Sequence, residues 1–128
     1  MRLLLDTQIA LWAWTQPERI PETLRLAITG ARNEVWFSQV SALEIHIKYG
    51  LGKLRLPERP EQFVPRAVDR SGFDYLPIQD SAIYFLDRLP NYHRDPFDRL
   101  LIAHSITGNY HLASVDPQIH RYPVLTVR

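Results

Sequence analysis

The chain has 128 residues, no cysteine and a formal net charge of +1 at pH 7, and 45% of its residues are hydrophobic. The absence of cysteine excludes disulfide bonds, thiolate metal sites and cysteine nucleophiles. The small net charge is unlike that of a strongly basic nucleic-acid-binding domain, so contact with a polyanion would need a local basic patch or a metal ion. A chain of this length is expected to form one domain, spanning residues 1–128. We expect it in the cytoplasm, and no apolar run approaches the roughly 20 residues that cross a bilayer.

The order of apolar runs and turn residues predicts the fold class. Short runs rich in Leu, Val, Trp and Phe predict strands over residues 2–6, 33–39, 73–78, 110–116 and 122–127. Apolar residues at helical spacing, bounded by Ser, Pro or Gly, predict helices over residues 7–16, 20–30, 38–50, 60–72, 79–90 and 95–108. Strands that alternate with helices indicate an α/β fold of three layers, an α/β/α sandwich around a mainly parallel sheet.

Acidic residues follow two of the predicted strands. Asp6 ends the first strand, and Asp116 ends the strand that reads YHLASV. In an open parallel sheet ligands bind outside the carboxyl ends of the strands, so both carboxylates are expected at that edge. Asp98, near the start of the preceding helix, and Glu44, in the helix after the second strand, are expected to reach the same edge.

Each of these acids also has a purely structural interpretation. Asp6 is suited to cap the helix that follows it, and Asp116 precedes Pro117 in a common turn pattern. In the stretch DPFD, Asp95 reads as a helix N-cap before a proline at the first helical position, and Asp98 falls at the third. A carboxylate in the first turn of a helix is still able to point into a cleft, so Asp98 is compatible with both roles.

Glu44 is the acid whose burial is most informative. It stands in the otherwise apolar or small segment VSALEIHI, where Val40, Leu43 and Ile47 recur at helical spacing. This spacing places Glu44 near the predicted buried face of the helix, where an unpaired carboxylate is unfavourable. The alternative is an exposed helix residue with no special role.

Clustered carboxylates repel one another, and a bound Mg²⁺ or Mn²⁺ ion removes that repulsion because hard cations prefer oxygen ligands. A carboxylate-bound ion activates water and neutralises charge on a phosphate. A zinc site is not expected, since cysteine is absent and the five histidines show no ligand spacing, which favours structural roles for all of them. Phosphate-binding glycine loops and the GxSxG nucleophile elbow are also absent.

Four segments taken in order resemble a known family: RLLLDTQIALWAW, SALEIHIKYGLGKLRLP, HRDPFDRLLIAHS and LASVD. Together they resemble the PIN domain of VapC-type toxin ribonucleases from type II toxin–antitoxin systems. The resemblance covers nearly the whole chain and implies cleavage of RNA that depends on Mg²⁺ or Mn²⁺. It also implies a cognate antitoxin that blocks the site, a homodimer, and contact with operator DNA only through the antitoxin.

The resemblance assigns the metal-site and catalytic acids to Asp6, Glu44, Asp98 and Asp116, with Asp95 and Ser114 as accessory residues near the site. The chain departs from the family pattern at Gln8, where His is common, and at His46, where a small residue is common. Neither position supplies an expected metal ligand, so these departures concern the substrate rather than the metal chemistry.

Binding of RNA next to an acidic site requires cations around it. The segment HIKYGLGKLRLPER and the stretch HRDPFDR supply the predicted substrate-binding residues, which are Lys48, Lys53, Arg55, Arg94 and Arg99, with Arg59 as a further cation. For each residue alone, the alternative is an ordinary solvated surface charge.

Three other functions compete with a ribonuclease. A metal-dependent phosphatase with an aspartate after the first strand commonly has a second aspartate two residues later, and Gln8 breaks that pattern. A non-catalytic PIN-like module for nucleic-acid binding or scaffolding would be expected to lack the acids, and all four are present. A DNA-directed nuclease remains open.

Overall fold

The structure is a computed structural model that describes residues 1–124 and 126–127. Its centre is a five-stranded sheet with the strand order β3-β2-β1-β4-β5, in which every pairing is parallel. The strands are β1 (Arg2–Leu5), β2 (Glu34–Ser38), β3 (Asp74–Leu76), β4 (His111–Ala113) and β5 (Thr126–Val127). The prediction of a mainly parallel sheet is therefore confirmed.

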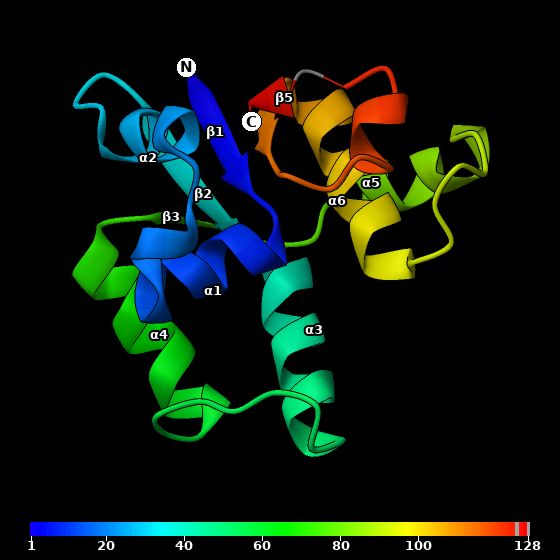
Figure 1. Ribbon diagram of the computed structural model, residues 1–128. Helices are drawn as coiled ribbons and strands as arrows, with labels where there is room; N and C mark the ends of the chain where they lie inside the picture. The colour runs from blue at the N-terminus through cyan, green and yellow to red at the C-terminus, as the bar shows by residue number, and fades with distance from the viewer. Residues whose placement is uncertain (125, 128) are drawn as a thin grey trace.

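Helices cover both faces of this sheet. They are α1 (Thr7–Thr15), α2 (Glu22–Thr29), α3 (Gln39–Gly50), α4 (Pro60–Ser71), α5 (Asp80–Phe85) and α6 (Pro96–Gly108), with short 3₁₀ turns η1 (Pro17–Arg19), η2 (Leu86–Arg88) and η3 (Ile119–Arg121). In Figure 1, α1, α2 and α4 lie to one side of the strands and α5 and α6 to the other. The predicted helix over residues 79–90 is broken into α5 and η2, and the predicted helix over residues 60–72 continues through Pro65.

Two hydrophobic cores, one on each face of the sheet, confirm the three-layer α/β/α sandwich. Leu3 and Leu5 of β1 point into the core shared with α1, α2 and α4, while Leu4 points into the core shared with α5 and α6. All three side chains are fully buried, because a parallel sheet covered on both faces has no solvent-facing side. No helix among the described residues is long and apolar enough to cross a membrane.

Helix α3 buries only part of the face predicted for it. Leu43 and Ile47 are 46% and 42% exposed, while Glu44 and Ile45 are buried. The prediction that Glu44 lies near the buried face is confirmed: Val40, one turn before it, is fully buried, but Leu43 and Ile47 lie on the outer side of α3. This helix has apolar residues on both sides, so its spacing alone did not identify the buried one.

An acidic pocket at the carboxyl edge of the sheet

A pocket of about 390 Å³ lies at the carboxyl ends of β1 and β4, next to α3 and the start of α6. All four predicted acids line it, together with both predicted lysines. The full lining consists of Asp6, Thr7, Gln8, Leu11, Glu44, Ile45, Lys48, Lys53, Leu54, Asp98, Val115 and Asp116. The sheet topology thus brings together acids that are as far as 110 positions apart in the chain (116 minus 6).

Asp6 connects the sheet to the first helix. Its backbone N–H donates to the carbonyl of Ala113 over 3.0 Å, which continues the pairing of β1 with β4. Its Oδ1 accepts from the backbone N–H of Ile9 over 2.8 Å, which caps α1. Asp6 therefore has the expected capping role and also lies in the pocket.

Asp95 and Asp98 have different surroundings at the start of α6. Oδ1 of Asp95 accepts from the backbone N–H groups of Phe97 and Asp98, over 2.8 and 3.4 Å, so Asp95 is the N-cap that its sequence position predicts. The carboxylate of Asp98 takes no part in this cap and lines the pocket.

His93 lies between two of the acids. Its Nε2 is 3.0 Å from Oδ2 of Asp98 and 3.0 Å from Oδ2 of Asp116. The histidine spacings had indicated structural roles only, and the residue reaches the acids through the turn that enters α6. The one signal in the sequence is its place directly before the RDPFD stretch, because a residue there must lie near the helix start that carries Asp98.

Asp116 is oriented by its own turn. Its Oδ1 accepts from the backbone N–H of Gln118 over 2.9 Å, and its backbone N–H donates to the hydroxyl of Ser114 over 3.0 Å. Ser114 is fully buried, so this predicted accessory residue shapes the turn that presents Asp116 to the pocket.

Glu44 is held by two side chains, one of which is itself in contact with a third. Its Oε1 accepts a 2.7 Å hydrogen bond from the hydroxyl of Thr7, and the Thr7 hydroxyl lies 2.8 Å from that of Ser41. Its Oε2 forms an ion pair with Lys48, one turn further along α3. The ammonium group offsets the unfavourable burial of this carboxylate, and the same ion pair raises the pKa of Lys48.

The pKa of Asp6 is raised from its usual value to about 6. Burial is the main cause, and the negative charges of Asp116 and Glu44 add to it. Hydrogen bonds from the Ser114 hydroxyl and the Ile9 backbone lower the pKa and oppose the shift only in part.

The pKa of Asp98 is raised further, to about 7. Burial is again the main cause, followed by the charges of Asp95 and Glu44, while His93 acts in the opposite direction. The acids of this pocket are therefore difficult to ionise together near neutral pH, and a cation among them would relieve that repulsion.

The carboxylates of this pocket suit a hard divalent cation, and two of them lie close together beside a histidine. One oxygen each from Asp98 and Asp116 and Nε2 of His93 lie within 4.8 Å of one another, and this is the tight cluster found in the described part of the chain. Asp6 and Glu44 are not in that cluster but line the same pocket. Carboxylate oxygens dominate the site, which favours Mg²⁺ or Mn²⁺ over zinc.

The predicted substrate-binding cations differ in whether other groups of the protein already engage their side chains. Lys48 and Lys53 line the pocket, and Arg55 and Arg94 are exposed on segments flanking it. Arg99 is engaged within the protein: its guanidinium donates to the carbonyls of Pro90 and Leu86, over 2.9 and 3.0 Å, and to the hydroxyl of Tyr122 over 3.3 Å.

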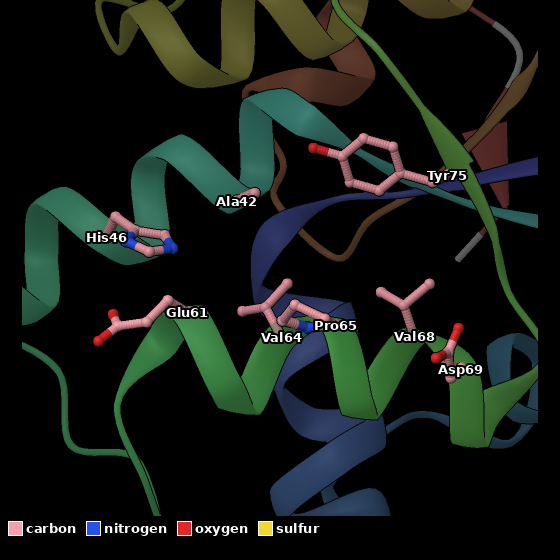
Figure 2. Close-up of a pocket in the computed structure, with 8 residues that line it drawn as sticks. All are labelled: Ala42, His46, Glu61, Val64, Pro65, Val68, Asp69 and Tyr75. Atoms are coloured by element: carbon pink, nitrogen blue, oxygen red, sulfur yellow. The ribbon is translucent and has the colours of Figure 1, made fainter.

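A second pocket of about 370 Å³ lies between α3 and α4 and is mostly apolar. Figure 2 shows Val64 and Val68 of α4 facing α3, with His46 of α3 opposite Glu61 of α4 at one end. Its two acids, Glu61 and Asp69, stand on α4 eight positions apart (69 minus 61) rather than converging. The chemistry of clustered carboxylates therefore belongs to the acidic pocket.

Comparison with known proteins agrees with this geometry. The PIN domain family matches residues 3–125, so the chain belongs to the PIN domain family, whose members are usually nucleases. A search among curated proteins found no match.

Several solved structures share the fold. A chain of VapBC2 from Rickettsia felis, bound to a DNA fragment from the promoter, has a TM-score of 0.72 at 18% identity, with 100% of both chains covered. A chain of FitAcB from Neisseria gonorrhoeae has a TM-score of 0.65 at 16% identity, covering 98% of this chain and 96% of that one. VapBC-1 from nontypeable Haemophilus influenzae has a TM-score of 0.65 at 14% identity, with 94% and 91% covered.

Proposed function

We propose that this chain is the toxin of a type II toxin–antitoxin pair, a divalent-metal-dependent endoribonuclease inhibited by a cognate antitoxin. The observation that carries the proposal is the convergence of Asp6, Glu44, Asp98 and Asp116 in one pocket at the carboxyl edge of a PIN-domain sheet. The raised pKa values of Asp6 and Asp98 support it, since they indicate acids that gain most from a bound cation.

In this proposal Asp6, Asp98 and Asp116 hold a Mg²⁺ or Mn²⁺ ion, which when bound supplies an activated water and neutralises charge on the phosphate. Glu44, whose carboxylate is fixed by Thr7 and Lys48, would complete the ligands of the ion or orient the attacking water. Hydrolysis leaves a 5′-phosphate and a 3′-hydroxyl. Asp95 and Ser114 act as accessory residues that shape the two turns carrying Asp98 and Asp116.

We propose that Lys48, Lys53, Arg55 and Arg94 form the phosphate track. Lys48 and Lys53 are at the pocket, and Arg55 and Arg94 extend the positive charge beyond it. Arg99, first expected in this set, is left out of the proposed track because protein oxygens engage its guanidinium and it does not line the pocket. Lys48 is paired with Glu44 but lines the pocket, and its side chain is 44% exposed.

The proposed partners are a cognate antitoxin and a second copy of the chain, in a homodimer. Two observations support a protein partner: the similar solved structures are VapBC and FitAB complexes, and α3 exposes the apolar side chains of Leu43 and Ile47. Contact with operator DNA is proposed only through the antitoxin. We propose a single PIN-like domain over residues 1–128 that acts in the cytoplasm.

The decisive experiment is cleavage of total RNA by purified, antitoxin-free protein with Mg²⁺, with Mn²⁺ and with EDTA. We expect metal-dependent cuts that disappear in Asp98→Asn and persist in the control Asp69→Asn, which changes an acid outside the acidic pocket. Single-stranded and duplex DNA are tested in parallel. Cleavage of DNA alone would replace RNA with DNA as substrate, and no cleavage from a folded protein would favour a binding module.

A further inference from the structure

The turn between η2 and α6 places one imidazole between two acids from separate elements. Asp98 belongs to α6, whereas Asp116 lies in the turn after β4, and Nε2 of His93 is 3.0 Å from a carboxylate oxygen of each. The His93 side chain is 16% exposed, so little water competes for these contacts. The contact with Asp116 has the geometry of a hydrogen bond, and the carboxylate of Asp98 lies equally close to the same nitrogen.

The other ring nitrogen determines what His93 does there. Its Nδ1 accepts a 3.2 Å hydrogen bond from the backbone N–H of Asp95, so Nδ1 carries no proton and the ring proton is on Nε2. A histidine that binds a metal through Nε2 carries its proton on Nδ1. In His93 that Nδ1–H would point at the backbone N–H of Asp95, so two donors would face each other without an acceptor. In this orientation His93 is therefore a hydrogen-bond donor to Asp116 and not a metal ligand.

The backbone of the same turn is held by a buried tyrosine. The hydroxyl of Tyr122 accepts from the backbone N–H of His93 over 2.8 Å and from that of Tyr92 over 3.1 Å. Nη1 of Arg99 donates to the same hydroxyl over 3.3 Å. The Tyr122 ring packs against Tyr92 with 5.2 Å between ring centroids, and Tyr122 is only 4% exposed.

We propose that His93 is a positioning residue that spaces Asp98 and Asp116, with Nε2–H donating to Asp116 beside the carboxylate of Asp98, and that Tyr122 fixes His93 in that place. This inference rests on the proposed function, since it assigns both residues to the site that would hold the metal. An N–H that donates to Asp116 and lies 3.0 Å from Asp98 holds the two carboxylates near each other, from α6 and from the turn after β4, before any cation arrives. Outer partners of this kind orient metal-binding side chains and are typically worth about 10-fold to 100-fold in affinity.

The test is Mn²⁺ affinity by titration calorimetry on metal-free protein. We expect His93→Ala and Tyr122→Phe to weaken binding about 10-fold. His93→Gln keeps an N–H donor near the place of Nε2, so its affinity should stay within roughly threefold of wild type. Tyr110→Phe is the matched control, because Tyr110 is also buried and its hydroxyl has no hydrogen-bond partner among the described residues.

The variants separate the roles of donor and ligand. Equal losses in His93→Gln and His93→Ala would overturn the donor role in favour of a ligand role. Wild-type affinity in Tyr122→Phe would overturn the role of Tyr122. Thermal unfolding of the metal-free variants checks that they are folded. If loss of any buried tyrosine hydroxyl weakened metal binding by disturbing the structure, Tyr110→Phe would also bind Mn²⁺ less tightly.

A second readout needs no metal. Nitrogen-15 NMR of the His93 ring in the metal-free protein should place the proton on Nε2, and a proton on Nδ1 would overturn the inference. A wild-type protein with no Mn²⁺ affinity would overturn the metal-dependent function and the role of His93 in metal binding. Tight Mn²⁺ binding with the proton on Nδ1 would leave the proposed function standing and remove this inference alone.

Discussion

The hydroxyl of Thr7 donates a 2.7 Å hydrogen bond to Oε1 of Glu44 and so joins the first residue of α1 to the middle of α3. Both residues are buried. An ionised carboxylate only accepts, so Thr7 must be the donor. We expect Thr7→Val to leave this carboxylate oxygen without that partner and to reduce the free energy of unfolding by about 1–3 kcal/mol in urea denaturation.

Thr15→Val is the matched control for this substitution. The hydroxyl of Thr15 bonds to the carbonyl of Leu11 at an exposed position of the same helix, so its loss should change the free energy of unfolding by less than about 0.5 kcal/mol. Equal losses in the two variants would show that the contact with Glu44 contributes nothing beyond the loss of a threonine hydroxyl.

The sequence alone was sufficient for the sheet and for the acids at its edge, because both follow from local patterns. An apolar run ending in an acid places Asp6 at the carboxyl end of a strand wherever that strand lies in the sheet. The position of His93 was not predictable in this way, because it depends on a turn held by Tyr122, 29 residues further along the chain. The buried face of α3 was predicted only in part: Val40 and Glu44 are buried, but Leu43 and Ile47 continue the apolar pattern on the outer side.

The stability of the metal-free protein should depend on pH through Asp6 and Asp98. Their pKa values rise from 3.8 to about 6 and about 7, so the folded state binds protons more tightly than the unfolded chain does. The stabilisation of the folded state by this tighter proton binding is present in full below a pH of about 3.8. It is lost as the pH rises through about 6 and 7, where the two acids ionise in the folded state. In EDTA, urea denaturation should show that these two acids favour folding more at pH 5 than at pH 8.

Asp98→Asn isolates this effect from other titrating groups. Burial lowers the pKa of His104, so this residue disfavours folding as the pH falls, opposite to the two acids. His104 is present in both proteins, and its effect therefore cancels in the comparison. The difference in unfolding free energy between pH 5 and pH 8 should change by roughly 1 kcal/mol or more between wild type and Asp98→Asn. Identical pH profiles would mean that Asp98 titrates as an ordinary carboxyl.

Addition of metal should reverse the instability of the acid cluster at neutral pH. A cation that binds only the folded state, at 100 times its dissociation constant, adds about 2.7 kcal/mol to the free energy of unfolding. We expect this increase for wild type with Mn²⁺ at pH 7.5, its loss on addition of EDTA, and its absence at the same Mn²⁺ concentration in Asp98→Asn. A rise of the same size in the variant would place the binding site elsewhere.

The proposed phosphate track predicts a dependence on salt. In an Asp98→Asn background, in which the proposed function predicts no cleavage, we expect Lys53→Gln with Arg55→Gln to weaken binding of single-stranded RNA. The slope of log affinity against log salt should become less steep by about 1.4, because two phosphate contacts are lost. Fluorescence anisotropy at several salt concentrations measures both quantities.

Arg32→Gln is the control for the loss of positive charge outside the proposed track. Arg32 is exposed in the turn before β2, at the amino ends of the strands and opposite the acidic pocket. Its replacement should leave both the affinity and the slope close to those of the parent protein. A loss as large as that of the track variant would indicate attraction by overall charge rather than a defined track.

The two glycines that end α3 and α6 should respond in opposite ways to alanine. A Cβ atom on Gly108 would lie 2.5 Å from Cε2 of Tyr110, whose ring is buried and packs edge-on against Trp36, whereas a Cβ atom on Gly50 meets nothing within 4 Å. We expect Gly108→Ala to lower the free energy of unfolding by about 1–3 kcal/mol. Gly50→Ala should raise it by roughly 0.5–1 kcal/mol, because alanine favours the helix. Thermal unfolding of the two variants side by side measures the contrast, and a Gly108→Ala protein as stable as wild type would show that the Tyr110 ring moves aside without loss of packing.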